Sequence, residues 1–442
     1  MIRWAAADAA RYIQSRARFG IKPGLDRTRA LLRELGDPQD SLRFVHIAGT
    51  NGKGSTSAML AAVLAQSGYR TGLYTSPSLH SLYERIAVNG VPVCADDFAD
   101  AVWRVREAAQ RMRGADEPTE FEIMTAAALA HYARADVDIV VLEAGLGGRY
   151  DATNVVRPEV TVISNVDYDH MEILGSRLET IAFDKAGILK AGVPALSGAT
   201  GAAQRVILRV AGGVGAPLAL RDRDLRAVQE GAQGFSGQRL SYFGLDADLC
   251  GAALRLIGSH QVQNAALALG AVELLRRRGL ILPEPAVRRA LRGVTWPGRL
   301  EVVAGDRPVI LDGAHNRPGA AVLAGALREL GIKRAVFVVG VFADKDISGM
   351  MRAFAPLMAE VVPVAAQGGR AAPAEVVAQA ARAVAGGEVF VHPGQTLARG
   401  MATGLRAARA ADALVVTGSL STVAMAREWL GLQDPVDHES VQ

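Results

Sequence analysis

The sequence predicts an α/β protein: a parallel-sheet domain with a phosphate-binding loop and a small antiparallel extension, followed by a smaller doubly wound α/β domain. Short apolar runs alternate with helical runs along most of the chain, which is typical of parallel strands connected by helices. The alternation breaks at residues 296–299 and then resumes. A length of 442 residues also exceeds that of a typical single domain, so two domains are expected.

The first domain is expected to cover residues 1–295 and to open with a helix within residues 1–19. The next elements are an apolar strand at residues 44–47, a glycine-rich turn, and a helix from Ser55 to about Gln66. Further buried strands are predicted at residues 71–74, 137–142 and 160–164. An Ala-rich helix at residues 125–133 precedes the strand at 137–142. The pattern weakens at residues 201–254, which predicts the antiparallel extension, and a helix at residues 261–277 follows.

The second domain is expected to cover residues 299–442. Its apolar runs recur with helical segments between them, as in an open sheet wound in both directions. The predicted strands are at residues 309–311, 335–339, 361–364, 389–391 and 414–417.

Composition excludes several classes of protein. The 49 basic and 45 acidic residues are well mixed, so no basic block indicates nucleic-acid binding. No apolar run approaches the roughly 20 residues that span a bilayer, and we expect a cytoplasmic protein. Cys94 and Cys250 have neither disulfide-framework nor metal-ligand spacing, and we expect two buried thiols.

The glycine-rich turn after the first strand predicts a phosphate-binding loop. Its residues are Gly49, Thr50, Asn51, Gly52, Lys53, Gly54 and Ser55. Backbone N–H groups of such a turn, together with a helix N-terminus, surround phosphate oxygens, and a solvent-facing Lys53 would reach the β- and γ-phosphates of ATP. The general pattern has Gly at position 47 and Ser or Thr after the lysine, whereas this chain has Ile47 and Gly54. The loop is therefore a particular subtype.

Three polar residues follow strand ends and predict a magnesium site. Ser76 follows residues 71–74, Glu143 ends the strand at 137–142, and His170 lies past the strand at 160–164. Ligands of open parallel sheets bind beyond the carboxyl ends of the strands. Glu143 and Ser76 offer the oxygen atoms that Mg²⁺ prefers, while His170 is a less usual ligand.

These segments together resemble the folylpolyglutamate synthase and dihydrofolate synthase family, a branch of the ATP-dependent Mur ligases. The resemblance extends over almost the whole chain in the family's order. The matching stretches lie at residues 49–56, 75–77, 84–86, 143–154, 164–175, 184–190, 260–264, 296–299, 311–316, 344–346 and 417–419.

The resemblance implies a role for each matching residue. Residues 49–55 would hold the triphosphate, with Lys53, Lys185 and Arg299 taking part in catalysis. Asn264, Arg299, Asp312 and His315 would bind the nucleotide. Ser76, Glu143 and His170 would meet Mg²⁺. Lys185 matches a lysine that Mur-type ligases convert to a carbamate, which would bind a second Mg²⁺, although an unmodified Lys185 could equally contact phosphate. The stretch with Phe121, Glu122 and Thr125 resembles one that precedes a helix near the folate.

The implied reaction is ligation through an acyl phosphate: a folate or dihydropteroate carboxylate attacks ATP, and L-glutamate then displaces phosphate. Domain closure would keep water from that intermediate. One alternative is a Mur-type ligase of cell-wall precursors, which the Gly54 insertion and the Ser76-Pro77 segment disfavour. Another is a nucleotide-dependent switch, which has little use for a second nucleotide-facing domain. We expect a monomer with small-molecule substrates only, without nucleic-acid or membrane partners.

Overall fold

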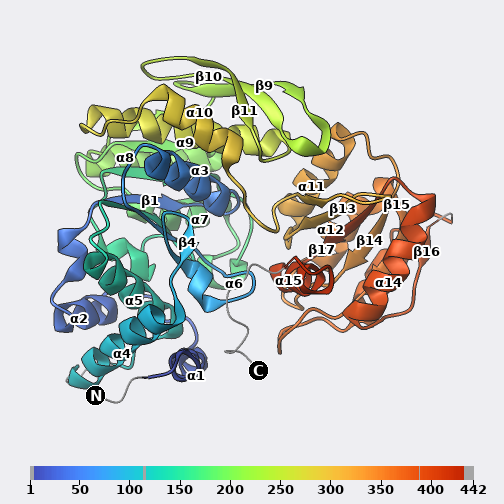
Figure 1. Cartoon of the computed structure of the whole chain (residues 1–442), viewed down its shortest axis with the longest axis horizontal. Coiled ribbons are helices and arrows are strands. Elements are labelled where there is room, and N and C mark those ends of the chain that lie inside the picture. The colour runs from blue at the N-terminus through green and yellow to red at the C-terminus, as the bar shows by residue number, and fades with distance from the viewer. Residues whose placement is uncertain (1–3, 113–115, 388, 433–442) are drawn as a thin grey trace.

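The computed structural model describes residues 4–112, 116–387 and 389–432. In this part of the chain the strands form an eight-stranded sheet, a three-stranded sheet and a six-stranded sheet. The first two sheets lie in the N-terminal part of the chain, and the third forms the C-terminal lobe on the right of Figure 1. The α/β class and the two-lobed plan predicted from the sequence are confirmed.

The eight-stranded sheet has the order β4-β3-β2-β5-β1-β6-β7-β8. Its strands are β1 Phe44–Ala48, β2 Thr71–Tyr74, β3 Ile86–Val88, β4 Val91–Pro92, β5 Ile139–Glu143, β6 Val160–Ile163, β7 Ala195–Ser197 and β8 Leu218–Leu220. The run from β2 to β8 is parallel, whereas β3 and β4 pair antiparallel at one edge. Every residue of β1, β5 and β6 is buried, because helices cover both faces of a parallel sheet.

Two layers of helices cover this sheet, and each closes an apolar core. One layer consists of α1 Ala6–Arg16, α2 Asp26–Glu34, α4 Ala95–Arg111 and α5 Glu120–Arg134. The other consists of α3 Lys53–Gln66, α9 Ser259–Arg277 and α10 Glu284–Gly293. Both layers are visible above and below the sheet in Figure 1. Short helices α6 Met171–Leu174 and α7 Leu178–Lys185 follow β6 at the edge of the cleft.

The predicted extension at residues 201–254 is only partly antiparallel. Its first part forms α8 Gly201–Val214 and the parallel strand β8, so the main sheet continues further than expected. The rest forms the separate antiparallel sheet of β9 Arg226–Ala232, β10 Gln238–Phe243 and β11 Leu249–Leu254. This sheet packs on α9 and α10, because its buried side chains join the core that those helices share with α3.

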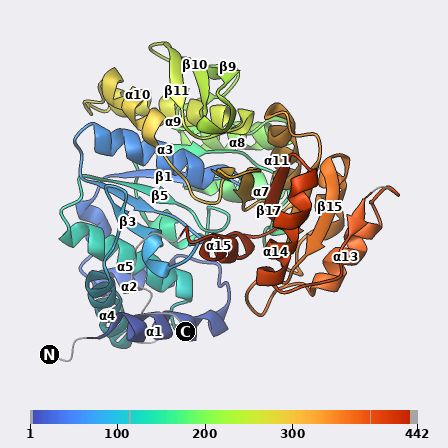
Figure 2. The same cartoon turned by 45° about the vertical axis from the view of Figure 1, so that its right-hand side comes forward.

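The C-terminal sheet has the order β12-β13-β17-β14-β15-β16, and only β12 is antiparallel to its neighbour. Its strands are β12 Glu301–Val303, β13 Val309–Asp312, β14 Ala335–Val339, β15 Met358–Pro363, β16 Phe390–Val391 and β17 Ala413–Thr417. One face is covered by α11 Arg317–Glu329, α12 Ile347–Phe354 and α13 Ala374–Arg382, and the other by α14 Leu397–Ala407 and α15 Leu420–Trp429. Figure 2 shows α15 turned toward the first lobe.

Local expectations need three corrections. Helix α3 begins at Lys53, not at Ser55, because the left-handed Gly52 lets the helix start directly after the turn. Helix α5 begins at Glu120, five residues before the predicted start, because Thr119 caps it through a reciprocal bond with Glu122. Both cysteines are exposed, not buried: Cys94 precedes α4, and Cys250 occupies an outward position of the half-covered strand β11. Among the described residues, no helix has the length and apolar character needed to cross a membrane.

Candidate active site

The carboxyl ends of four strands meet at one edge of the first sheet, facing the second lobe. Strand pairing aligns Ile47 of β1 with Glu143 of β5, Ala48 of β1 with Ile163 of β6, and Tyr74 of β2 with Leu142 of β5. The loops that leave these strands therefore start side by side. Together with residues of the second lobe, they enclose a cavity of about 440 Å³.

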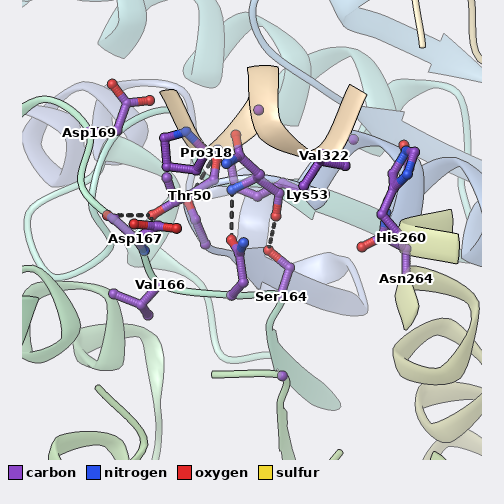
Figure 3. Close-up of a pocket in the computed structure, with 18 of the residues that line it drawn as sticks. Thr50, Lys53, Ser164, Val166, Asp167, Asp169, His260, Asn264, Pro318 and Val322 are labelled. Atoms are coloured by element: carbon purple, nitrogen blue, oxygen red, sulfur yellow. Dashed lines mark hydrogen bonds between the residues drawn. The ribbon is translucent and has the colours of Figure 1, made fainter. Parts of the chain in front are cut away.

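Most of the predicted site residues line this one cavity, although they are distant in sequence. The lining includes Gly49, Thr50, Asn51, Gly52, Lys53, Gly54, Ser55, Ser76, Glu143, His170, Lys185, Asn264, Arg299, Asp312 and His315. Figure 3 shows Lys53 and Thr50 of the loop opposite Pro318 and Val322, which belong to α11 of the second lobe. A ligand in the cavity would therefore contact both lobes.

Glycines shape the phosphate loop where a side chain could not fit. Gly52 has a φ of 82°, and a Cβ there would collide with the side chain of Asn264. A Cβ at Gly54 would lie 3.0 Å from Nε1 of Trp296, tighter than nearly all normal contacts. The packing of Trp296 therefore explains why glycine follows the lysine in this loop.

Lys53 is more enclosed than the sequence suggested. It is the first residue of α3, its side chain is only 16% exposed, and its Nζ donates to the carbonyl oxygens of Gly49 and Thr50 at 3.2 and 3.3 Å. Its Nζ also lies 4.0 Å from Oε1 of Glu143. The ammonium group is thus held over the loop, at the positive end of the α3 dipole.

Two buried groups face this ammonium group. Burial raises the pKa of Glu143 to about 7, although the charge of Lys53 opposes part of the rise. Burial, reinforced by the charge of Lys53, lowers the pKa of Lys185 to about 7, and its Nζ donates to the carbonyl oxygen of Gly49 at 2.8 Å. Both groups therefore change protonation state near pH 7, and perturbed groups of this kind cluster at functional sites.

The three predicted metal ligands offer donor atoms suited to a divalent cation. The Ser76 hydroxyl is buried and lacks a hydrogen-bond partner among the described residues, and the Ser76 N–H donates to Glu143 at 3.4 Å. Partial desolvation, together with the positive charges of Lys345 and Lys53, lowers the pKa of His170 to about 4, so its imidazole is neutral at pH 7 and has a lone pair for a metal. A hydroxyl without a partner and a desolvated carboxylate beside it are the groups that a cation would satisfy.

No cluster of three or more His, Cys, Asp or Glu side chains suited to a metal occurs among the described residues. A site completed by phosphate and water oxygens needs no such cluster, because Mg²⁺ keeps several water and phosphate ligands when it binds with a nucleotide. The Ser76, Glu143 and His170 set fits that kind of site.

The second-lobe residues are organised differently. Asp312 accepts the backbone N–H groups of Leu300 and Ala314, each at 2.8 Å, so its carboxylate shapes the loops at the lobe junction. A ring nitrogen of His315 lies 2.8 Å from the carbonyl oxygen of Gly313, while Nη1 of Arg299 makes a long contact of 3.5 Å to the carbonyl oxygen of Gly298. Asn264 of α9 donates to Gln261, one turn before it.

The three residues predicted near the folate do not line this cavity. Glu122 is buried and pairs with Arg27, and Thr125 is buried against the hydroxyl of Tyr74. Only the ring of Phe121 reaches toward the site, because it packs closely over Gly145 in the loop after β5.

In the loop that follows β6, sequence reasoning gave a role to His170 alone, whereas the structure places most of the loop in the cavity wall. Asn165, Asp167 and Asp169 lie on this loop and line the cavity. Asn165 accepts the N–H of Asn51 through its side-chain oxygen at 2.7 Å. Asn165, Asp167 and Asp169 follow the carboxyl end of a central parallel strand, and this position could have identified them as site residues. His170 was identified by the same rule.

A phosphate loop that faces a second α/β lobe across a cavity with buried ionisable groups indicates an enzyme that binds a nucleotide between its two lobes. The chain matches the Mur ligase middle domain at residues 47–272 and the Mur ligase, glutamate ligase domain at residues 298–420. A dihydrofolate synthase/folylpolyglutamate synthase of Bacillus subtilis is 40% identical over 354 residues, which are 78% of this chain and 81% of that protein. The chain belongs to the folylpolyglutamate synthase/dihydrofolate synthase family of Mur ligases.

Solved structures agree with this family. Mycobacterium tuberculosis folylpolyglutamate synthase complexed with ADP has a TM-score of 0.90 and 34% identity, over 97% of this chain and 99% of that chain. A bifunctional folylpolyglutamate synthase/dihydrofolate synthase of Yersinia pestis, complexed with AMPPNP and a Mn ion, has a TM-score of 0.85 and 30% identity. That match covers 97% of this chain and 98% of that chain.

Proposed function

We propose that this chain joins the amine of L-glutamate to a carboxylate of a folate, using ATP and forming an acyl phosphate. The observation that carries the proposal is the single cavity that contains the phosphate loop, Glu143, Lys185 and the second-lobe residues. The folate carboxylate attacks the γ-phosphorus and releases ADP. The glutamate amine then attacks the acyl carbon, and phosphate leaves with the bonding electrons as the nitrogen loses its proton.

The protein contributes mainly position and charge. Residues 49–55 would surround the triphosphate with backbone N–H groups, and Lys53 would neutralise charge on the transferred phosphoryl group. Arg299, at the lobe junction, would reach the phosphates when the lobes close. Asn264, Asp312 and His315 would hold the rest of the nucleotide. Enclosure by both lobes would exclude water from the acyl phosphate.

Ser76, Glu143 and His170 would hold Mg²⁺. The cation supplies charge neutralisation and orientation of phosphate oxygens when it is bound with the nucleotide. The Yersinia pestis relative is complexed with a Mn ion, which supports a divalent cation here, and the oxygen-rich donor set favours magnesium.

For Lys185 we propose carbamylation. A neutral amine attacks CO₂, a C–N bond forms, and one proton is released to give the carbamate. The pKa of about 7 supports this, because an ordinary lysine is almost wholly protonated at neutral pH. The carbamate would bind a second Mg²⁺. An unmodified Lys185 that contacts phosphate is the competing role.

We further propose that the catalytic unit consists of an ATP-binding domain at residues 1–295 and a C-terminal domain at residues 299–442. Both walls of the cavity come from one chain, which supports a monomer that binds only small molecules. The cytoplasmic location stays a prediction. A folate site around Phe121, Glu122 and Thr125 also stays a prediction, supported by the contact of Phe121 with the Gly145 loop.

The test is ATP hydrolysis and incorporation of labelled glutamate by the purified protein. We expect ADP formation to require both a reduced folate and L-glutamate. ATP hydrolysis that ignores both substrates would support a nucleotide switch, and incorporation only with a cell-wall precursor would support the other branch of Mur ligases.

Dihydropteroate is a second acceptor to test, because the Bacillus subtilis relative is named for both activities. Dihydropteroate and tetrahydrofolate should be compared as acceptors at equal concentration. Product from both would show a bifunctional enzyme, and product from one would assign the acceptor.

A further inference from the structure

The loop at residues 164–170, which we name the bridging loop, is hydrogen-bonded to the phosphate loop. The Thr50 N–H donates to the carbonyl oxygen of Asn165 at 3.0 Å, and the Thr50 hydroxyl accepts the N–H of Asp167 at 3.0 Å. The hydroxyl of Ser164 donates to the carbonyl oxygen of Asn51 at 2.8 Å. Figure 3 shows Thr50 beside Asp167, and Asp169 further along the same loop. The position of the bridging loop is therefore tied to that of the phosphate loop.

The far end of the bridging loop contacts the second lobe through Asp169. Its carboxylate accepts Nδ2 of Asn316 at 2.9 Å and Nζ of Lys345 at 3.0 Å, and Nε2 of His315 lies 3.7 Å away. The Asp169 and Lys345 side chains are each only 10% exposed. Asn316 is the N-cap of α11, and Lys345 lies in the loop after β14.

These contacts do little for the fold of the first lobe. Within its own lobe, the Asp169 carboxylate contacts the adjacent His170, whereas its contacts with Asn316, His315 and Lys345 all cross the cavity. By contrast, the buried Glu122 pairs with Arg27 of its own lobe. The bonds of Asp169 to the second lobe can form only when the lobes are close together. Loss of one partner of an ion pair with low exposure leaves an uncompensated charge, so removal of Asp169 or Lys345 would disfavour the closed arrangement.

We propose that Asp169 is a positioning residue that fixes the second lobe over the phosphate loop through Lys345 and Asn316. This rests on the proposed function, in which ATP bridges the two lobes. The bridging loop then connects the phosphate loop to the second lobe. The phosphate loop positions Asp167 through Thr50. Asp169, two residues further on, positions α11 and the loop after β14. Asn316 adds a direct contact, because its Nδ2 lies 3.4 Å from Oδ1 of Asn51.

The first test compares Asp169→Asn, Lys345→Gln and the double variant. Asp169→Asn keeps the shape and removes the charge. We expect kcat to fall about tenfold in each single variant and no further in the double variant, because residues in one network are not additive. The KM for ATP should change by less than about twofold, since neither Asp169 nor Lys345 is assigned a contact with the nucleotide.

Asp344→Asn is the matched control. Asp344 also lies beside Lys345, at 3.6 Å, but it belongs to the second lobe and spans no gap. Its kcat should stay within about twofold of wild type, as expected for a partly exposed ion pair. Equal losses in Asp344→Asn and Asp169→Asn would overturn the proposal, and so would losses that add in the double variant.

A second measurement does not depend on ligase activity. Spin labels on the exposed Cys94 and on V376C of α13, in a C250S background, report the distance between the lobes. With AMPPNP and Mn²⁺ we expect one short distance in the labelled parent and a broad, longer distribution after Asp169→Asn. Identical distributions would overturn the role of Asp169. A parent that closes but never links glutamate to folate would instead overturn the proposed function.

Discussion

The two walls of the cavity differ in how their polar groups are used. In the first lobe, desolvation shifts the pKa values of Glu143, Lys185 and His170, and Oε1 of Glu143 lies 4.0 Å from Nζ of Lys53. In the second lobe, Asp312 and His315 are bonded to the backbone of their own loops. The first wall therefore holds groups whose charge a ligand could complete, which suits the proposed phosphate and metal site, whereas the polar groups of the second wall already have partners in their own lobe.

This difference separates residues that can act chemically on a ligand from residues that shape the loops around it. Buried charges without full compensation are costly, so they persist where a ligand of opposite charge completes them. Carboxylates that accept two backbone N–H groups, such as Asp312, are already satisfied and serve to shape a loop. Variants in the two walls should therefore fail in different ways.

The largest loss is expected for Lys53→Ala. Removal of an ammonium group that neutralises developing phosphoryl charge typically costs about 10²–10³ in rate. The melting temperature should change little, because the hydrogen bonds of Lys53 stay within its own loop and Glu143, 4.0 Å from Nζ, can take up a proton near pH 7. Lys333→Ala, an exposed lysine of the second lobe, is the control and should behave as wild type. Near-normal turnover of folded Lys53→Ala would show that the first wall is not the phosphate site.

Lys185→Ala should lose turnover by about 10²-fold, since it removes one charge of the same wall. If Lys185 carries a carbamate, small added carboxylates should restore part of the activity. Bicarbonate labelled with ¹³C should give a carbamate signal in wild type that grows from pH 6 to pH 8, because the neutral amine, favoured above a pKa of about 7, is the reactive form. An absent signal at pH 8, with no restored activity, would favour the unmodified phosphate contact.

The affinity of the AMPPNP complex for Mn²⁺ should fall as pH drops below about 7. The raised pKa of Glu143 means that the protonated form gains population there, and protons compete with the cation for the carboxylate. One pH unit below the pKa, only about a tenth of the group is ionised, which predicts about a tenfold loss. Glu143→Gln should bind weakly at every pH. A wild-type profile that stays flat from pH 6 to 8 would remove Glu143 from the metal site.

The smallest expected effect is that of Arg299→Ala in the second wall. Its contact would mature only on closure, so kcat should fall about fivefold while the KM for ATP changes less. A steady-state comparison with Lys53→Ala separates the two walls directly. If Arg299→Ala instead raised the KM for ATP strongly with kcat unchanged, Arg299 would bind the open state and the distinction between the walls would fail.

Residues at strand ends were the part of the site that sequence could predict. The phosphate loop, Ser76, Glu143 and His170 follow apolar runs, and neighbouring parallel strands must end at the same edge. In the bridging loop only His170 received a role, because Asn165 and Asp169 act through partners more than one hundred residues away in the chain. Exposure of Cys250 was also predicted wrongly, since its outward position depends on which face of β11 the helices cover.

The sequence alone determined the α/β class, the two-lobed plan and the subtype of the phosphate loop, because apolar periodicity and glycine-rich turns act locally in the chain. Only the tertiary structure decided that Trp296 closes on Gly54, that Lys53 lies beside Glu143, and that Asp169 reaches Lys345 across the cavity. Desolvation and pairing depend on which groups meet in space. The pKa values of the first wall and the contact between the lobes are therefore properties of packing.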